Sequence, residues 1–159
     1  MSLRELQTSR LRAAPWQGLA DAELADLFAP NVVQWLPAGF QSPADEGARR
    51  AFLQAVSQQA EVIALRNPAG QGIGLVILSF PEEGGATRNL GYLFAESAWG
   101  QGLASELIAG LQAYFRGSGV TLSGGVMQEN AASARVLEKA GFTPELAGAE
   151  TVYSWRAGS

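Results

Sequence analysis

The spacing of apolar residues changes near residue 60, and this change restricts the possible folds more than any other feature of the sequence. Before it, apolar residues recur mostly at helical spacing, which predicts helices over residues 20–29 and from the start signal at 42–45 to about 59. After it, residues 61–66 and 72–80 are rich in strand-forming side chains and are separated by turn residues. We therefore expect a mostly helical first third followed by a β-hairpin.

Strands and helices alternate over the rest of the chain. The pattern predicts strands at 89–95, 120–127 and 152–155, and helices at 101–116 and 130–140. Helices, then an antiparallel meander, then alternating strands and helices are typical of a mixed α/β (α+β) fold. A chain of 159 residues has the usual length of one domain, so we expect a single domain over residues 1–159.

The chain contains neither His nor Cys. This composition excludes Ser-His-Asp triads, thiolate nucleophiles and zinc sites built on imidazole or thiolate. Catalytic groups must therefore be carboxylates, hydroxyls, arginines, the one lysine or backbone amides, and we expect no metal.

The charge balance is acidic, with 11 Lys and Arg against 15 Asp and Glu and a formal net charge of −4. This balance argues against a nucleic-acid partner. The longest apolar stretch, at residues 74–78, is much shorter than the ~20 residues of a membrane helix, and the first residues lack the apolar core of a signal peptide. We expect a cytoplasmic protein without a membrane partner.

A strand-to-helix junction at residues 99–104 is the clearest sign of ligand binding. Gly100 and Gly102 permit a tight turn, and the following helix would direct its free N–H groups at a phosphate. An ordinary tight turn has the same composition. A P-loop is excluded, because the only lysine is the distant Lys139. A dinucleotide fingerprint would have Gly at position 105, where this chain has Ser105; because Ala or Ser is sometimes tolerated there, nicotinamide-dinucleotide binding stays an alternative.

The segment at residues 130–142 is the second informative one. Asn130 and Ser133 are three positions apart, so both project from the same side of a first helical turn. Asn130 also fits an ordinary helix N-cap, and Gly141 fits a helix stop.

Together these segments resemble the GNAT superfamily of acyl-CoA-dependent N-acetyltransferases, and within it the ribosomal-protein alanine N-acetyltransferase (RimJ/RimL-type) branch. Trp99 fits this branch, which often has Trp before the paired glycines. The other positions that carry the resemblance extend over most of the chain, at residues 8–12, 34–37, 72–74, 90–92 and 141–142.

The resemblance implies a mostly antiparallel central sheet, splayed between its fourth and fifth strands and flanked by about four helices, with the pantetheine arm of acetyl-CoA in the gap. It places the backbone of Leu93 and Phe94 against the pantetheine amides, with strand N–H groups near Phe94 facing the developing oxyanion. Asn130 would hold the arm and Ser133 would lie near the sulfur. The residues that would cradle the pyrophosphate are Trp99, Gly100, Gln101, Gly102, Leu103, Ala104 and Ser105.

Two basic residues, Arg135 and Lys139, lie one helical turn apart. They would either face the nucleotide phosphates or form an ordinary solvated helix face.

The acid that protonates the leaving thiolate is not supplied by the resemblance. Many superfamily members have a Tyr seven residues after the Asn, but Leu137 stands there in this chain, as is usual in this branch. Tyr92 and Tyr153 are available in predicted strands, where tyrosine usually serves packing. Ser133 or solvent would therefore have to act as the acid.

The sequence does not identify the general base either, and this limits which acceptor amine can react. Glu96 and Glu129 are the candidate general bases, with solvated loop acids as the alternative. An α-amine of pKa ~7.7–8 is about a tenth neutral at pH 7, whereas a lysine amine near 10.4 is neutral in under roughly one part in a thousand. A weakly basic acceptor is therefore favoured. We expect its pocket to draw on the first two helices and the loop 35–40, with Gly124 and Gly125 widening it.

The sequence thus predicts an acetyl-CoA-dependent N-acetyltransferase whose acceptor amine, a protein N-terminus or a small molecule, attacks the thioester directly. It would act as a monomer or homodimer. The alternatives are a catalytically silent acyl-CoA-binding protein on the same fold and, less favoured, a nicotinamide-dinucleotide-binding enzyme.

Overall fold

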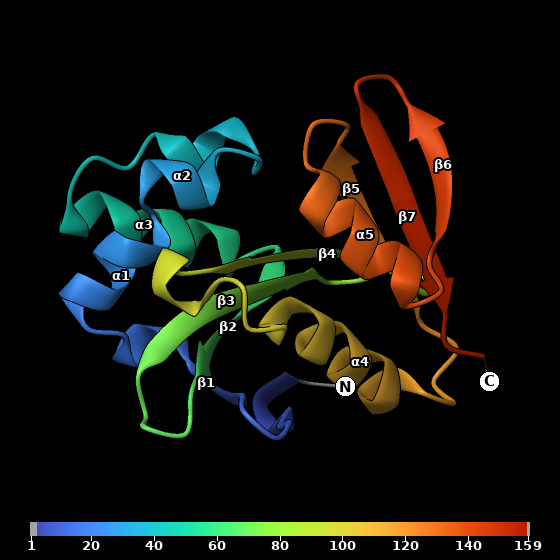
Figure 1. The fold of residues 1–159 in the computed structure, drawn as a ribbon, viewed down its shortest axis with the longest axis horizontal. Helices are drawn as coiled ribbons and strands as arrows, with labels where there is room; N and C mark the ends of the chain where they lie inside the picture. Colours follow the sequence, from blue (N-terminus) through green and yellow to red (C-terminus); the bar gives the residue numbers. More distant parts are fainter. Residues whose placement is uncertain (1–2, 159) are drawn as a thin grey trace.

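The computed structural model describes residues 3–158, which form a seven-stranded sheet with helices on both faces (Figure 1). The strand order is β1-β2-β3-β4-β5-β7-β6, and every neighbouring pair is antiparallel except β4 and β5. The strands are β1 (Arg12–Pro15), β2 (Ala60–Arg66), β3 (Gly72–Ser79), β4 (Thr87–Phe94), β5 (Thr121–Met127), β6 (Thr143–Ala147) and β7 (Glu150–Arg156). The α-helices are α1 (Asp21–Leu27), α2 (Pro30–Val33), α3 (Glu46–Val56), α4 (Leu103–Phe115) and α5 (Ala131–Lys139).

The parallel pair β4 and β5 is joined over only three residue pairs, from Thr87 opposite Thr121 to Asn89 opposite Ser123. Beyond these pairs the two strands diverge, and Figure 1 shows β5 leaning away from β4 together with β6 and β7. This arrangement confirms the mixed fold and the splayed sheet that the sequence analysis predicted.

Two apolar cores lie on opposite faces of the sheet. The first is built on α4, whose Leu107, Ile108, Leu111 and Phe115 are fully buried, as expected for an apolar stripe at helical spacing. The second packs α1, α2 and α3 on the other face of β2, β3 and β4. No helix within residues 3–158 is long and apolar enough to cross a membrane.

The first sixty residues are less helical than predicted. Residues 12–15 form the edge strand β1, which pairs with β2 and ends at Pro15. The helix predicted at 20–29 is present but shorter, because α1 covers Asp21–Leu27, and Pro30 begins a separate single turn, α2. Proline lacks an N–H group and disfavours helical geometry in the residue before it, so a continuous helix cannot pass this point.

The helix predicted from the start signal at residues 42–45 begins later than expected from the Ser42 hydroxyl as its N-cap. Asp45 is the N-cap of α3, and its carboxylate accepts a hydrogen bond of 2.8 Å from the N–H of Ala48. The helix ends at Val56 rather than Gln59.

The edge strand β6 was not predicted, because none of its residues is buried and it shows no alternation of apolar and polar side chains. All five positions are exposed, Leu146 to 77%, and Pro144 interrupts the strand-forming residues. Pairing with β7 alone therefore holds it in the sheet.

A buried ion pair secures the paired end of β4. Arg88, which is 5% exposed and stands opposite Leu122 of β5, donates from Nη2 to Glu61 Oε1 at 3.0 Å. Its Nε donates to the carbonyl of Ser79 at 2.8 Å, and its guanidinium lies 5.9 Å from the centre of the Phe115 ring. One side chain thus ties β4 to β2, β3 and α4.

Replacing Arg88 should destabilise the protein far more than replacing an arginine of a surface ion pair. In Arg88→Met, the largely buried carboxylate of Glu61 would lose its guanidinium partner, and breaking a buried pair typically costs about 3–5 kcal/mol of unfolding free energy. Arg50→Met removes the more exposed ion pairs with Asp21 and Glu46 and should cost about 1 kcal/mol or less. Urea unfolding followed by tryptophan fluorescence measures both, and equal losses would show that Arg88 is not a structural anchor.

Candidate active site

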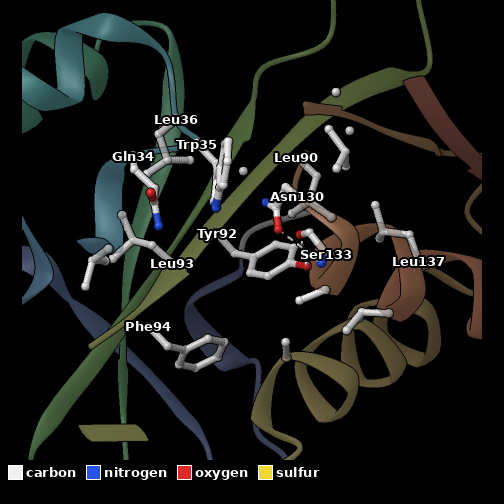
Figure 2. A pocket seen from close by; sticks show the side chains of 18 of the residues that line it. Gln34, Trp35, Leu36, Leu90, Tyr92, Leu93, Phe94, Asn130, Ser133 and Leu137 are labelled. Carbon is white, nitrogen blue, oxygen red and sulfur yellow. Dashed lines mark hydrogen bonds between the residues drawn. The ribbon is translucent and has the colours of Figure 1, made fainter. Parts of the chain in front are cut away.

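The divergence of β4 and β5 opens a cavity of about 340 Å³ (Figure 2). One wall comes from α2 and the residues after it, the floor from β4 and β5, and the other wall from α5. Its lining residues are Asn31, Val32, Gln34, Trp35, Leu36, Leu90, Gly91, Tyr92, Leu93, Phe94, Trp99, Ala104, Gly124, Gly125, Val126, Asn130, Ala132, Ser133, Val136 and Leu137. None of these described residues is an acid, an arginine or a lysine.

Gly91 keeps the floor of the cavity open. A Cβ atom built at this position would meet nothing within 4 Å, so any side chain there would project into free space. Gly124 and Gly125 also line the cavity. At Gly125 a Cβ would instead approach the carboxylate of Glu150 on β7, at 2.8 Å.

The glycine junction forms the N-terminus of α4. Gly100 and Gly102 have φ values of 74° and 76°, in the left-handed region that favours glycine, and Gly102 is the N-cap. The first N–H groups of a helix have no partner within it, and the helix dipole adds partial positive charge there. This end of α4 is therefore suited to an anionic group.

The N-terminal segment braces this junction. Arg10 donates from Nη1 to the carbonyl of Gln101 at 2.8 Å and forms an ion pair with Glu106 in α4, Nε to Oε1, at 2.7 Å. The hydroxyl of Thr8 and the N–H of Arg10 both donate to the same carboxylate. The positions 8–12 that contributed to the family resemblance thus hold the glycine loop in place.

Two predicted cofactor contacts interact with each other. The indole N–H of Trp99 donates to the carbonyl of Phe94 at 2.8 Å, although 47% of the Trp99 residue surface is exposed. The indole thereby fixes the end of β4 against the glycine loop at the mouth of the cavity.

A pair of hydroxyl groups spans the cavity from β4 to α5. The Tyr92 hydroxyl lies 2.8 Å from the Ser133 hydroxyl, and Figure 2 shows the two groups facing each other. Burial raises the pKa of Tyr92, with the hydrogen bond to Ser133 opposing the shift in part. The phenol therefore stays protonated near neutral pH. Asn130 caps α5, its Oδ1 accepting from the N–H of Ser133 at 3.3 Å.

The predicted site residues fall into three groups. Leu93, Phe94, Trp99, Ala104, Asn130 and Ser133 line the cavity together. Gly100, Gln101, Gly102, Leu103 and Ser105 lie at the N-terminus of α4, and of these Gln101 and Leu103 border a second hollow of about 350 Å³ beside Arg10. Glu96, Glu129, Arg135 and Lys139 are exposed, and none of the four lines the cavity.

Sequence reasoning missed several lining residues. Tyr92 was assigned to packing, and of the two strand tyrosines only Tyr153 is a core residue, at 5% exposure. Gln34, directly before the loop 35–40, was missed as well, whereas Trp35 and Leu36 lie in that loop and line the cavity, where the acceptor pocket was predicted. For Gln34 the only sequence signal was the family resemblance at 34–37, which assigned no role to it.

A family model described as the acetyltransferase (GNAT) domain matches residues 10–143. The chain therefore belongs to the GNAT acetyltransferase family, as its resemblance to that family predicted.

Several solved structures share the fold. RimL, a ribosomal alpha-N-protein acetyltransferase solved in complex with coenzyme A, has a TM-score of 0.76 at 18% identity, over 94% of this chain and 95% of that chain. RimJ of Mycobacterium smegmatis, in complex with CoA-disulfide, has a TM-score of 0.73 at 19% identity, over 92% and 81%. An acetyltransferase from Agrobacterium tumefaciens has a TM-score of 0.64 at 25% identity, over 98% and 95%. No curated protein matches the sequence.

The brace at Glu106 should make stability depend on pH. The hydrogen bond from the Thr8 hydroxyl and the bonds from Arg10 outweigh partial burial and hold the pKa of this carboxyl below its ordinary value of 4.5. The ionised carboxylate therefore stabilises the folded state above pH 4.5, and this contribution is lost as the pH falls through the lower folded-state pKa.

Glu106→Gln should accordingly lower the melting temperature at pH 7, and the difference from wild type should shrink as the pH falls below 4.5. Thermal unfolding followed by circular dichroism measures it. Glu83→Gln, in the exposed turn before β4, is the control and should show a smaller change. A Glu106→Gln effect that does not vary with pH would contradict this account.

Proposed function

We propose that this chain is an acetyl-CoA-dependent N-acetyltransferase in which an acceptor amine attacks the thioester directly. The observation that carries the proposal is the uncharged cleft between β4 and β5, which opens beside a glycine-capped helix N-terminus in a GNAT domain. Family membership favours this function over a nicotinamide-dinucleotide enzyme.

The residues of the cleft fit the chemistry of coenzyme A. The N-terminus of α4, with Gly100 and Gly102, would hold the pyrophosphate on backbone N–H groups. The open space above Gly91 leaves room for the narrow pantetheine arm, whose amides would pair with backbone groups of Leu93 and Phe94 and with Asn130. The bound coenzyme would supply the acetyl group as an activated thioester.

The lining residues also favour one class of acceptor. A protonated amine would lose water on entering the cavity and would find no carboxylate among the described lining residues, which is costly. A neutral amine avoids this penalty, and an α-amine is neutral far more often than a lysine side chain. The carboxamides of Asn31 and Gln34, beside Trp35, offer hydrogen bonds to a peptide or a small polar molecule. We therefore propose a protein N-terminus or a weakly basic small amine as acceptor.

Different groups of the protein would stabilise the oxyanion, donate to the sulfur and accept the proton of the amine. Strand N–H groups near Phe94 would stabilise the developing oxyanion. Ser133 would donate toward the sulfur. Glu96 and Glu129 remain the proposed bases, and because both are exposed outside the cavity they would accept the proton of the amine through water.

Acetyl-CoA should stabilise the folded protein. At 100 times its dissociation constant a ligand adds ~2.7 kcal/mol, which for a domain of this size raises the melting temperature by about 5–10 °C. A thermal-shift titration with acetyl-CoA, and with NAD as control, measures this effect. A shift with NAD alone would favour the dinucleotide alternative, and no shift with acetyl-CoA would overturn the proposal.

A variant that fills the cleft locates the binding site. Gly91→Val should fold, because valine suits a strand and a Cβ there meets nothing, but it should abolish the acetyl-CoA shift. Thr87→Val on the exposed part of the same strand is the matched control and should keep the shift. An unchanged shift in Gly91→Val would place the ligand elsewhere.

The acceptor class can be tested with a panel of peptides assayed by release of free thiol. We expect peptides with a free α-amine to react faster at pH 7 than the same peptides with a blocked N-terminus and one lysine. A clear preference for lysine would contradict the proposed acceptor. Thiol release with no acceptor in the panel, despite acetyl-CoA binding, would favour the catalytically silent alternative.

A further inference from the structure

The hydroxyl groups of Tyr92 and Ser133 form a hydrogen-bonded pair in the cavity wall, and one of their two O–H groups remains able to donate. Both residues are half-buried, both line the cavity, and they come from different elements, β4 and α5. Their oxygens lie 2.8 Å apart, a normal hydrogen-bond distance. Two hydroxyls in one hydrogen bond use only one of their two protons, so one O–H group remains free to donate.

The geometry limits where that free proton can go. The ring of Tyr92 is held in edge contact with Phe94, with centroids 6.5 Å apart. Ser133 is fixed in the first turn of α5 by the bond from its N–H to Asn130. If the phenol donates to Ser133, the serine proton is left to point into the cavity, at a helix end that favours negative charge.

The electrostatic surroundings keep this pair protonated. Tyr92 is the one titratable side chain among the described lining residues, since neither β4, β5, α5 nor the segment after α2 places an acid or a base in the cavity wall. Its pKa is raised by burial, so it remains a phenol at mildly alkaline pH, where a thiol of pKa ~8.5 is ionised.

We propose that Tyr92 is a positioning residue that orients the Ser133 hydroxyl as a hydrogen-bond donor to the sulfur of coenzyme A. The inference rests on the proposed function. It also explains how this chain dispenses with a hydroxyl at Leu137, which is buried and apolar.

The step conserves protons and electrons. When the carbon–sulfur bond breaks, its electron pair stays on the sulfur. The hydroxyl pair stabilises this thiolate through the hydrogen bond from Ser133 and keeps both of its own protons, because the phenol is a weaker acid than the thiol. The thiolate then takes a proton from water, and the proton of the amine leaves through water to the proposed base.

The test uses coenzyme A and desulfo-coenzyme A as probes and needs no acceptor. Their dissociation constants are measured by calorimetry at about pH 7 and about pH 9, on either side of the ordinary thiol pKa. A hydrogen bond to a charged group is worth about a tenfold change in affinity. The wild-type protein should therefore bind coenzyme A up to about tenfold more tightly at the higher pH, relative to desulfo-coenzyme A.

Four variants separate the roles. Ser133→Ala should lose this pH-dependent gain, Tyr92→Phe should lose most of it, and Ser133→Thr should restore it. Tyr153→Phe removes a phenol from the core outside the cavity and should leave the gain unchanged. In every variant, unchanged affinity for desulfo-coenzyme A shows that the protein is folded and the cleft intact.

Two results would overturn this inference but leave the proposed function unaffected. In the first, Tyr92→Phe keeps the full gain. In the second, Ser133→Ala keeps the gain while Tyr92→Phe loses it, which would make the phenol the direct donor. Failure of both probes to bind at either pH would overturn the proposed function as well, so the two failures are distinguishable.

Discussion

The ion pair between Arg88 and Glu61 is the interaction on which the site depends. It is buried where β4 meets β5, and it ties β4 to β2, β3 and α4 at once. Only three residue pairs join the two parallel strands, and Leu122 and Val126 of β5 also pack into the apolar core around α4. Because the closed end is anchored, the open end can diverge and expose the backbone of β4 without loss of the fold.

The cleft combines a low charge with fixed polar groups. The chain has no His or Cys, and the described cavity wall holds no acid or base other than the Tyr92 phenol. Backbone N–H groups, hydroxyls and carboxamides are left to orient reactants, and they need no change of protonation to do so. Rigid elements position each of them: the cap of α5 holds Ser133, and the bond from Trp99 holds the end of β4.

The sequence predicted the elements with strong local signals and missed those that depend on their neighbours. The turn residues between β2 and β3 and the glycines before α4 located those boundaries well. The edge strands β1 and β6 lack alternation and were missed, since only pairing with β2 and β7 makes them strands. Tyr92 and Tyr153 have equivalent local sequence settings, and only the divergence of β5 from β4 places one in a cavity and the other in the core.

The two prolines at the margins of the sheet bear on how the molecule behaves in concentrated solution. Both edges of the strand order, β1 and β6, contain a proline, Pro15 in one and Pro144 in the other. Each proline removes a hydrogen-bond donor from a short strand, so a foreign strand cannot continue a regular ladder there. Pro144, which made β6 hard to predict from the sequence, therefore also protects this edge of the sheet from aggregation.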